Sequence, residues 1–97
     1  MAMAYYIRDI QLKGVEGRQR IDRALTAPIA GRSNSATVAR RILLQVAIVN
    51  GIEAGELRTI LQDIPERTFY RGLERLQEQE LIHNGNELWG RKTWYMA

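Results

Sequence analysis

Residues 65–82 read Pro65-Glu-Arg-Thr-Phe-Tyr-Arg-Gly-Leu-Glu-Arg-Leu-Gln-Glu-Gln-Glu-Leu-Ile82. Pro65 interrupts the helical pattern before it and suits the first turn of a new helix. At about 100° per residue, the apolar side chains fall on one side of such a helix and the arginines on the other. The stretch therefore predicts an amphipathic helix from about Glu66 to Glu80, with one face in the core. The apolar side holds Phe69, Leu73 and Leu76; the opposite side holds Arg67, Arg71 and Arg75, flanked by Thr68 and Tyr70.

Upstream, residues 35–51 predict a long helix that is buried on most sides. Ser35 is a residue type that caps helix N-termini, because its hydroxyl can accept a hydrogen bond from a first-turn N–H group. Apolar residues then recur at steps of three and four, and the second half of the segment is apolar almost all round. Asn50 and Gly51 tolerate the left-handed backbone that commonly ends a helix.

A second, shorter helix is expected between these two. Ile52 stands alone as an apolar residue after Gly51, and the pattern indicates a short strand there. From about Glu53 to Ile64 the apolar residues again line one face, and acidic residues near the start suit the positive end of the helix dipole. The face consists of Leu57, Ile60, Leu61 and Ile64.

The C-terminal residues 81–96 are rich in strand formers around the turn signal Asn84-Gly85. They predict a two-stranded hairpin. We expect Trp94 and Met96 to point inward, and Trp89, Arg91 and Tyr95 to point outward.

The predicted order is therefore helix, short strand at Ile52, helix, tight turn, helix and hairpin. One part of this order resembles the recognition helix of winged helix-turn-helix regulators. The resemblance rests on the run Arg67-Thr-Phe-Tyr-Arg71, on the two leucines three residues apart that follow it, and on an apolar pair ending in Ile82. The later Gly90-Arg-Lys-Thr-Trp-Tyr95 resembles the returning strand of the wing. The resemblance covers residues 35–97 and departs from the pattern at Glu80, where these families usually have glycine.

The resemblance implies a mainly α fold with a small β-hairpin, in which three helices and a wing form residues 35–97 behind an N-terminal extension. It also implies a double-stranded DNA partner, with the recognition helix in the major groove and the wing on the flanking backbone or minor groove. We expect a homodimer on a two-fold operator and, most simply, a transcription regulator. The DNA-contacting residues implied are Arg67, Thr68, Tyr70, Arg71 and Arg75 on the helix, and Arg91 and Lys92 on the wing.

Residues 1–34 differ from the rest of the chain. They carry six basic and three acidic side chains, which is the whole net charge of +3. A short helix is expected from about Gly17 to Thr26, followed by a linker. The segment is interpreted as a basic arm, a dimerisation segment or a poorly ordered tail. Because Ile21 and Leu25 have no obvious partner in the chain, we expect residues 35–97 to fold without residues 1–30.

Two alternatives remain open for residues 35–97. Glu74 and Glu78 share the arginine stripe, and such charge pairs occur on any solvated helix. The eight basic side chains of this region are balanced by eight acidic ones. This balance favours a winged-helix protein-interaction module in a larger assembly. A DNA-binding accessory factor in replication, recombination or packaging is a further possibility.

Composition excludes several classes of protein. The 97 residues include no cysteine and one histidine, His83, so no zinc site of the Cys/His kind can form. No catalytic triad spacing or phosphate-binding glycine loop is present, so we expect no enzyme activity and no cofactor, and the sequence shows no evident small-molecule ligand. The N-terminus lacks the pattern of a signal peptide, and no apolar stretch is long enough to span a membrane. A cytoplasmic protein is therefore expected.

Overall fold

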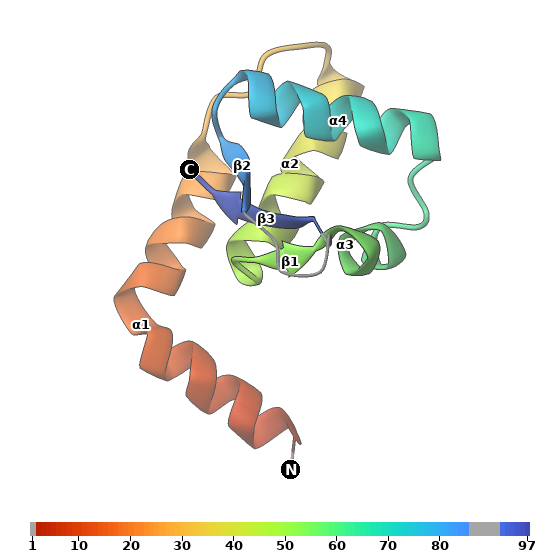
Figure 1. Ribbon diagram of the computed structural model, residues 1–97. Helices are drawn as coiled ribbons and strands as arrows, with labels where there is room; N and C mark the ends of the chain where they lie inside the picture. The colour runs from red at the N-terminus through yellow and green to blue at the C-terminus, as the bar shows by residue number, and fades with distance from the viewer. Residues whose placement is uncertain (1, 86–91) are drawn as a thin grey trace.

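The computed structural model describes residues 2–85 and 92–97, with side chains from residue 14 onward. The fold is mainly helical, with a small three-stranded antiparallel sheet (Figure 1). In chain order, the elements are α1 (Ala2–Thr26), α2 (Ser33–Ile48), β1 (Ile52–Glu53), α3 (Ala54–Ile60), α4 (Glu66–Glu78), β2 (Ile82–Gly85) and β3 (Thr93–Met96).

Helix α2 is the centre of the core, as its apolar pattern predicts. It packs against α1, α4 and strand β3. Its end is less enclosed than the pattern predicted, because Ile48 and the following Val49 are each 42% exposed. The expected cap at Ser35 is wrong, because the helix begins at Ser33 and Arg32 occupies the cap position. The sequence Ser33-Asn34-Ser35 offers three capping residue types in a row, and local preference does not choose among them. The buried side chains of α2 are Ala39, Ile42, Leu43, Val46 and Ala47.

Helix α4 packs its apolar side on α2, which confirms the orientation predicted from its periodicity. Phe69, Leu73 and Leu76 are all buried. Gly72 lies at the closest approach of the two helices, since a Cβ atom there would come within 2.8 Å of Ile42 Cδ1. A glycine inside a helix ordinarily lowers stability, and here it lets the two helices approach closely.

The helix ends at Glu78, two residues before the end expected, and the chain leaves it through a tight reversal. Glu80 has a φ of 59°, the left-handed conformation that glycine adopts most easily. The Glu80 N–H donates to the Gln77 carbonyl and the Leu81 N–H to the Leu76 carbonyl, which is the bond pattern of a Schellman motif. The turn thus has the geometry of a glycine turn, although glutamate stands at this position.

The C-terminal hairpin is present, but the turn predicted at Asn84-Gly85 is wrong, because both residues lie in β2 and pair with Trp94 and Thr93. Strand β1 joins the hairpin as a third strand. The strand order is β1-β3-β2, with Ile52 opposite Trp94 and Ile82 opposite Met96. Trp94 points into the core and is 5% exposed, as predicted. Tyr95 lies on the other side of the strand and stacks on His83, with ring centres 5.6 Å apart. Trp89 and Arg91 lie outside the described residues.

Helix α3 is shorter than expected, spanning seven residues instead of twelve. Leu61 and Ile64 follow it in the turn that leads to α4, and both are buried. Ile60 was expected on the apolar face, but 44% of its surface is exposed. Regular apolar spacing continues through the turn because the turn covers the same core. Periodicity alone therefore overestimates the length of the helix.

The N-terminal segment forms a longer helix than expected, and part of it belongs to the core. Helix α1 is kinked at Gly14, which has a φ of 39°. Beyond the kink it runs along α2 (Figure 1), where Ala24 is fully buried and Ile21 packs against the core. The core therefore extends N-terminal to the boundary expected at Ser35, and Ile21 has the intrachain partner that sequence did not reveal.

Arg40 of α2 holds the C-terminal end of α1. Its guanidinium donates hydrogen bonds to the carbonyl oxygens of Ala24 at 2.8 Å, Leu25 at 2.9 Å and Ala27 at 2.8 Å. The last carbonyls of a helix have no partner within the helix, and a planar group with five N–H donors can satisfy several of them together. Arg40 thus caps α1 from the neighbouring helix.

The adjacent Arg41 makes a different kind of contact. It forms two hydrogen bonds to Asp63, at 2.8 and 3.0 Å, on the solvent-exposed surface. The pKa of Asp63 is lowered from its ordinary value, mainly because Arg41 donates hydrogen bonds to the charged carboxylate. Exposed ion pairs of this kind contribute little to stability.

We expect Arg40→Ala to lower the free energy of unfolding by about 1.5–3 kcal/mol, the range for hydrogen bonds to charged groups. Arg40→Lys should restore only part of this loss, because an ammonium lacks the planar fork that reaches several carbonyls. Urea denaturation measures both effects, with Arg41→Ala as the matched control. Equal losses for Arg40→Ala and Arg41→Ala would show that Arg40 does not hold α1.

We expect Glu80→Gly to raise the free energy of unfolding by about 0.5–1 kcal/mol, because glycine adopts the left-handed backbone without steric strain. The control is Glu78→Gly, which places glycine inside the last turn of α4 and should lower stability by a similar amount. Thermal unfolding of the two variants provides the comparison. A loss of stability in Glu80→Gly would contradict the left-handed turn.

Candidate nucleic-acid interface

The N-terminal half of α4 displays polar and aromatic side chains on the side opposite the core. Arg67, Tyr70 and Arg71 are exposed, and Thr68 is half-buried. Among the described residues, neither Arg67 nor Arg71 has a hydrogen bond or ion pair to the protein. The Tyr70 ring stands edge-on to Phe69, with ring centres 5.2 Å apart, so a buried side chain supports it. These four residues all lie in the first turns of α4.

On one side of α4, Arg71 borders a small hollow shared with α2. The hollow has a volume of about 180 Å³ and is lined by Ser35, Val38, Thr68, Arg71, Gly72 and Arg75. It lies beside the first turn of α2, which has no side-chain cap. The unpaired N–H groups of a first helical turn carry partial positive charge, so this side of α4 is electropositive.

Arg75 is less available to a partner than its place in the arginine stripe suggested. It is half-buried, and its Nη1 donates to the Ala30 carbonyl at 3.2 Å. Its guanidinium lies directly against Gly31, where there is no room for a Cβ atom. The side chain of Gln79 holds the same linker through the Ala30 N–H at 3.3 Å. Arg75 thus fastens the linker between α1 and α2 to α4.

Lys92 lies on the other side of α4, at the start of β3. It is exposed and lines a larger pocket of about 590 Å³ between α3, α4 and the sheet, to which Tyr70 also contributes. Arg91, the second basic residue expected on the wing, lies outside the described residues. The predicted contacts are therefore divided: Thr68, Arg71 and Arg75 face the α2 side, and Tyr70 and Lys92 face the sheet.

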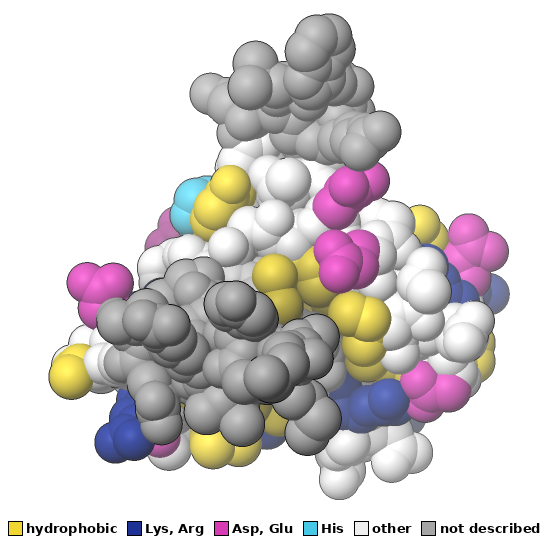
Figure 2. Space-filling model, turned by 90° about the horizontal axis from the view of Figure 1, so that it is seen from below, with side chains coloured by type: hydrophobic (Ala, Val, Ile, Leu, Met, Phe, Trp, Pro, Cys, Tyr) yellow, Lys and Arg dark blue, Asp and Glu magenta, His cyan; other side chains and the backbone are white. Residues whose placement is uncertain are grey.

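Acidic residues limit the extent of the basic surface. Glu66, Glu74 and Glu78 are exposed on α4 alongside the arginines. Figure 2 views the molecule from below, the side away from α4 in Figure 1, and there too acidic and basic side chains are scattered among hydrophobic ones without a single basic patch. A surface that binds a phosphate backbone would thus be confined to the first turns of α4 and its two flanks.

Two features of this surface were not predicted from sequence. Arg58 of α3 lies over the Phe69 ring, 5.1 Å from its centre, and donates to the Leu61 carbonyl at 2.9 Å. It also lines the larger pocket. The first turn of α2, which sequence placed in a linker, borders the hollow beside Arg71. Both depend on contacts between separate helices, and Arg58 is a lone basic residue without a local pattern.

Comparisons with protein-family models, curated proteins and solved structures found no match for this chain. Within the described residues, no helix has the length and apolar character needed to cross a membrane. The same residues contain no cluster of histidine and carboxylate side chains that could hold a metal ion.

Proposed function

We propose that this protein binds double-stranded DNA through a winged helix-turn-helix domain, with α4 as the recognition helix. The observation that carries the proposal is the exposed group Arg67, Tyr70 and Arg71 on the N-terminal half of α4. Two of these are arginines with no partner among the described residues, on a helix whose opposite face is anchored in the core. Arginine is well suited to paired hydrogen bonds with guanine or phosphate.

The arrangement of the other elements supports this proposal. Helices α2, α3 and α4, the short strand β1 and the hairpin of β2 and β3 follow the order of a winged helix, and the three-stranded sheet is compatible with that fold. In such a domain the strand connection forms the wing. Here that connection begins after Gly85, and Lys92 lies near its end.

The two flanks of α4 suggest how the domain would dock. With the first turns of α4 in the major groove, Arg71 and the start of α2 would face the phosphates of one strand, while Lys92 would face the backbone across the groove. Glu74 and Glu78 would keep the C-terminal half of the helix away from phosphates. Contacts to base edges or to the adjoining phosphates are thus assigned to Arg67, Thr68, Tyr70 and Arg71.

A single domain of this kind contacts a short site, so a homodimer on a two-fold operator is proposed, most simply in transcription control. A second candidate is a protein-interaction module, favoured by the balanced charge of residues 35–97 and by exposed apolar side chains. Ile60 and Tyr70 are 44% and 53% exposed, respectively.

We expect Arg71→Ala to weaken duplex binding without a large change in stability, because the side chain is exposed. A lost base contact should weaken binding by about 1–3 kcal/mol at one base position. A lost phosphate contact should weaken all sequences alike and reduce the salt slope by about one unit. Fluorescence anisotropy over a salt series measures both, and thermal melts check the fold.

Arg18→Ala is the matched control, since it removes an exposed arginine from α1. It should bind DNA like the wild type, and Glu78→Ala should bind as well or slightly better. If Arg71→Ala binds like the wild type and Arg18→Ala does not, the N-terminal segment carries DNA binding in place of α4. The absence of any duplex binding by the wild type at low salt would reject the DNA function and favour the interaction module.

A further inference from the structure

We propose that the pocket between α3, α4 and the sheet binds a small planar aromatic acid, and that this ligand competes with DNA for Tyr70 and Lys92. The binding of the acid stands on the pocket alone. The competition rests on the proposed function, because both side chains belong to the proposed DNA interface.

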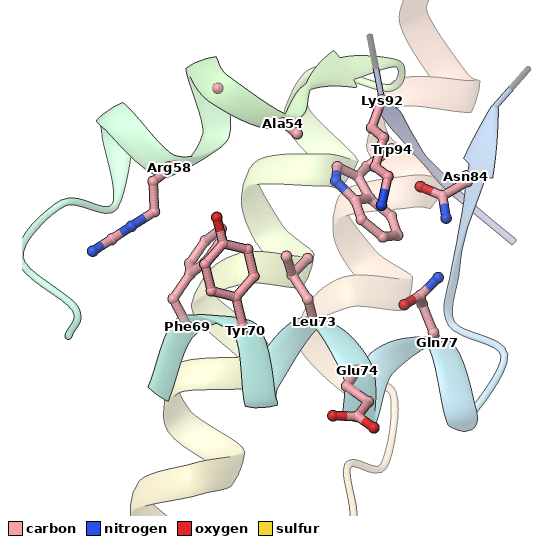
Figure 3. A pocket seen from close by; sticks show the side chains of 11 residues that line it. Ala54, Arg58, Phe69, Tyr70, Leu73, Glu74, Gln77, Asn84, Lys92 and Trp94 are labelled. Atoms are coloured by element: carbon pink, nitrogen blue, oxygen red, sulfur yellow. The ribbon is translucent and has the colours of Figure 1, made fainter. Parts of the chain in front are cut away.

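The pocket has the size and shape for a small ring compound. Its volume of about 590 Å³ lies within the range of small-molecule sites. Figure 3 shows Tyr70 and Trp94 on either side of Leu73, so that two aromatic side chains flank an aliphatic floor. On the α3 side the pocket is lined by Ala54 and Gly55, whose small size leaves the space open. A flat aromatic ring fits between such walls.

The polar groups around this space favour a negatively charged ligand. Lys92 contributes a positive charge, whereas the guanidinium of Arg58 points away from Lys92 and Trp94 (Figure 3). The amide side chains of Gln77 and Asn84 point toward each other across the gap between α4 and β2. Glu74 is the acidic residue among the lining side chains, and it points away from the others. A carboxylate would therefore meet the ammonium group of Lys92 at the rim of the pocket.

Trp94 supplies the second observation. The side chain is buried, and its Nε1–H has no hydrogen-bond partner among the described residues. A buried indole N–H usually finds an acceptor, and leaving it without one destabilises the protein. The Nε1 atom is covered, so the proposal requires that the indole or a neighbouring side chain shifts when the ligand binds. A carboxylate in the pocket would then accept a hydrogen bond from this N–H group.

Duplex DNA satisfies these features less well. A duplex is too wide to enter the pocket, so its phosphates would reach the rim at Lys92 and leave the space between Tyr70 and Trp94 empty. The aromatic walls and the buried donor call for one ligand that carries both a ring and an acceptor.

The test titrates 2-naphthoate into the ¹⁵N-labelled full chain and follows the indole Nε1–H resonance of Trp94, assigned with Trp89→Phe. We expect a saturable shift of this resonance. Gly55→Leu should block the pocket, because a Cβ atom at Gly55 meets only Glu53 Oε1, at 3.9 Å, and the added side chain enters open space. It should weaken binding by about tenfold or more, whereas Gln62→Leu, a leucine outside the pocket, should bind like the wild type.

Lys92→Gln should also weaken 2-naphthoate binding by about tenfold, because a charged hydrogen bond is lost. This variant replaces Gly55→Leu as the test of the site if Gly55→Leu does not fold. The neutral isostere 2-naphthamide should bind at least tenfold more weakly than 2-naphthoate. Equal binding of the two compounds would overturn the assignment of an acid. A resonance that does not shift, a shift that does not saturate, or unchanged binding by both variants would overturn the site.

The competition is measured separately by fluorescence anisotropy. We expect 2-naphthoate to release duplex DNA from the wild type and from Gln62→Leu, but not from Gly55→Leu. Simultaneous binding of DNA and 2-naphthoate would overturn the competition. If duplex DNA shifts the Trp94 resonance and 2-naphthoate does not, the pocket belongs to the DNA interface and the ligand proposal fails. A protein that binds 2-naphthoate but no DNA would leave the site standing and reject the proposed function.

Discussion

The burial of α2 on several sides at once is the constraint on which the other elements depend. The buried side chains of α2 include Ile42, Leu43 and Val46, and the free energy of removing them from water requires partners on more than one side. Helix α4, strand β3 and the second half of α1 supply these partners. Because Gly72 brings α4 into close contact with Ile42, the rotation of α4 about its axis is set by packing. The outward direction of Arg67 and Arg71 follows from that packing.

This constraint links the core to the candidate interface. Phe69 and Leu73 anchor α4, so the residues between and beside them in sequence are presented on a rigid surface. Arg75 donates a hydrogen bond to the Ala30 carbonyl in the linker, and Arg58 lies over the ring of Phe69. Two of the arginines near α4 therefore hold the domain together, while two others are left to meet a partner. A count of basic residues would not separate these roles, whereas their hydrogen bonds do.

The pocket beside α4 arises where three elements meet without filling the space between them. Ala54 and Gly55 are too small to close it, and Trp94 covers its sheet side while its N–H donor has no acceptor among the described residues. Polar groups buried without partners are uncommon in native structures, and they occur at functional sites more often than elsewhere in a core. The position of the pocket beside Tyr70 and Lys92 places any occupant next to the candidate interface.

The sequence by itself determined the two faces of α4, the order of the helices and the presence of a hairpin with Trp94 inward, because side-chain periodicity acts over a few neighbouring positions. It misplaced the turn of the hairpin, since Asn84 and Gly85 lie in β2. It did not show that Ala24 belongs to the core, that Arg40 caps α1, or that Arg75 is bound to the linker. Nor did it reveal the pocket between α3, α4 and the sheet. Each of these is a contact between residues far apart in the chain, and only the packing of the helices against one another brings such residues together.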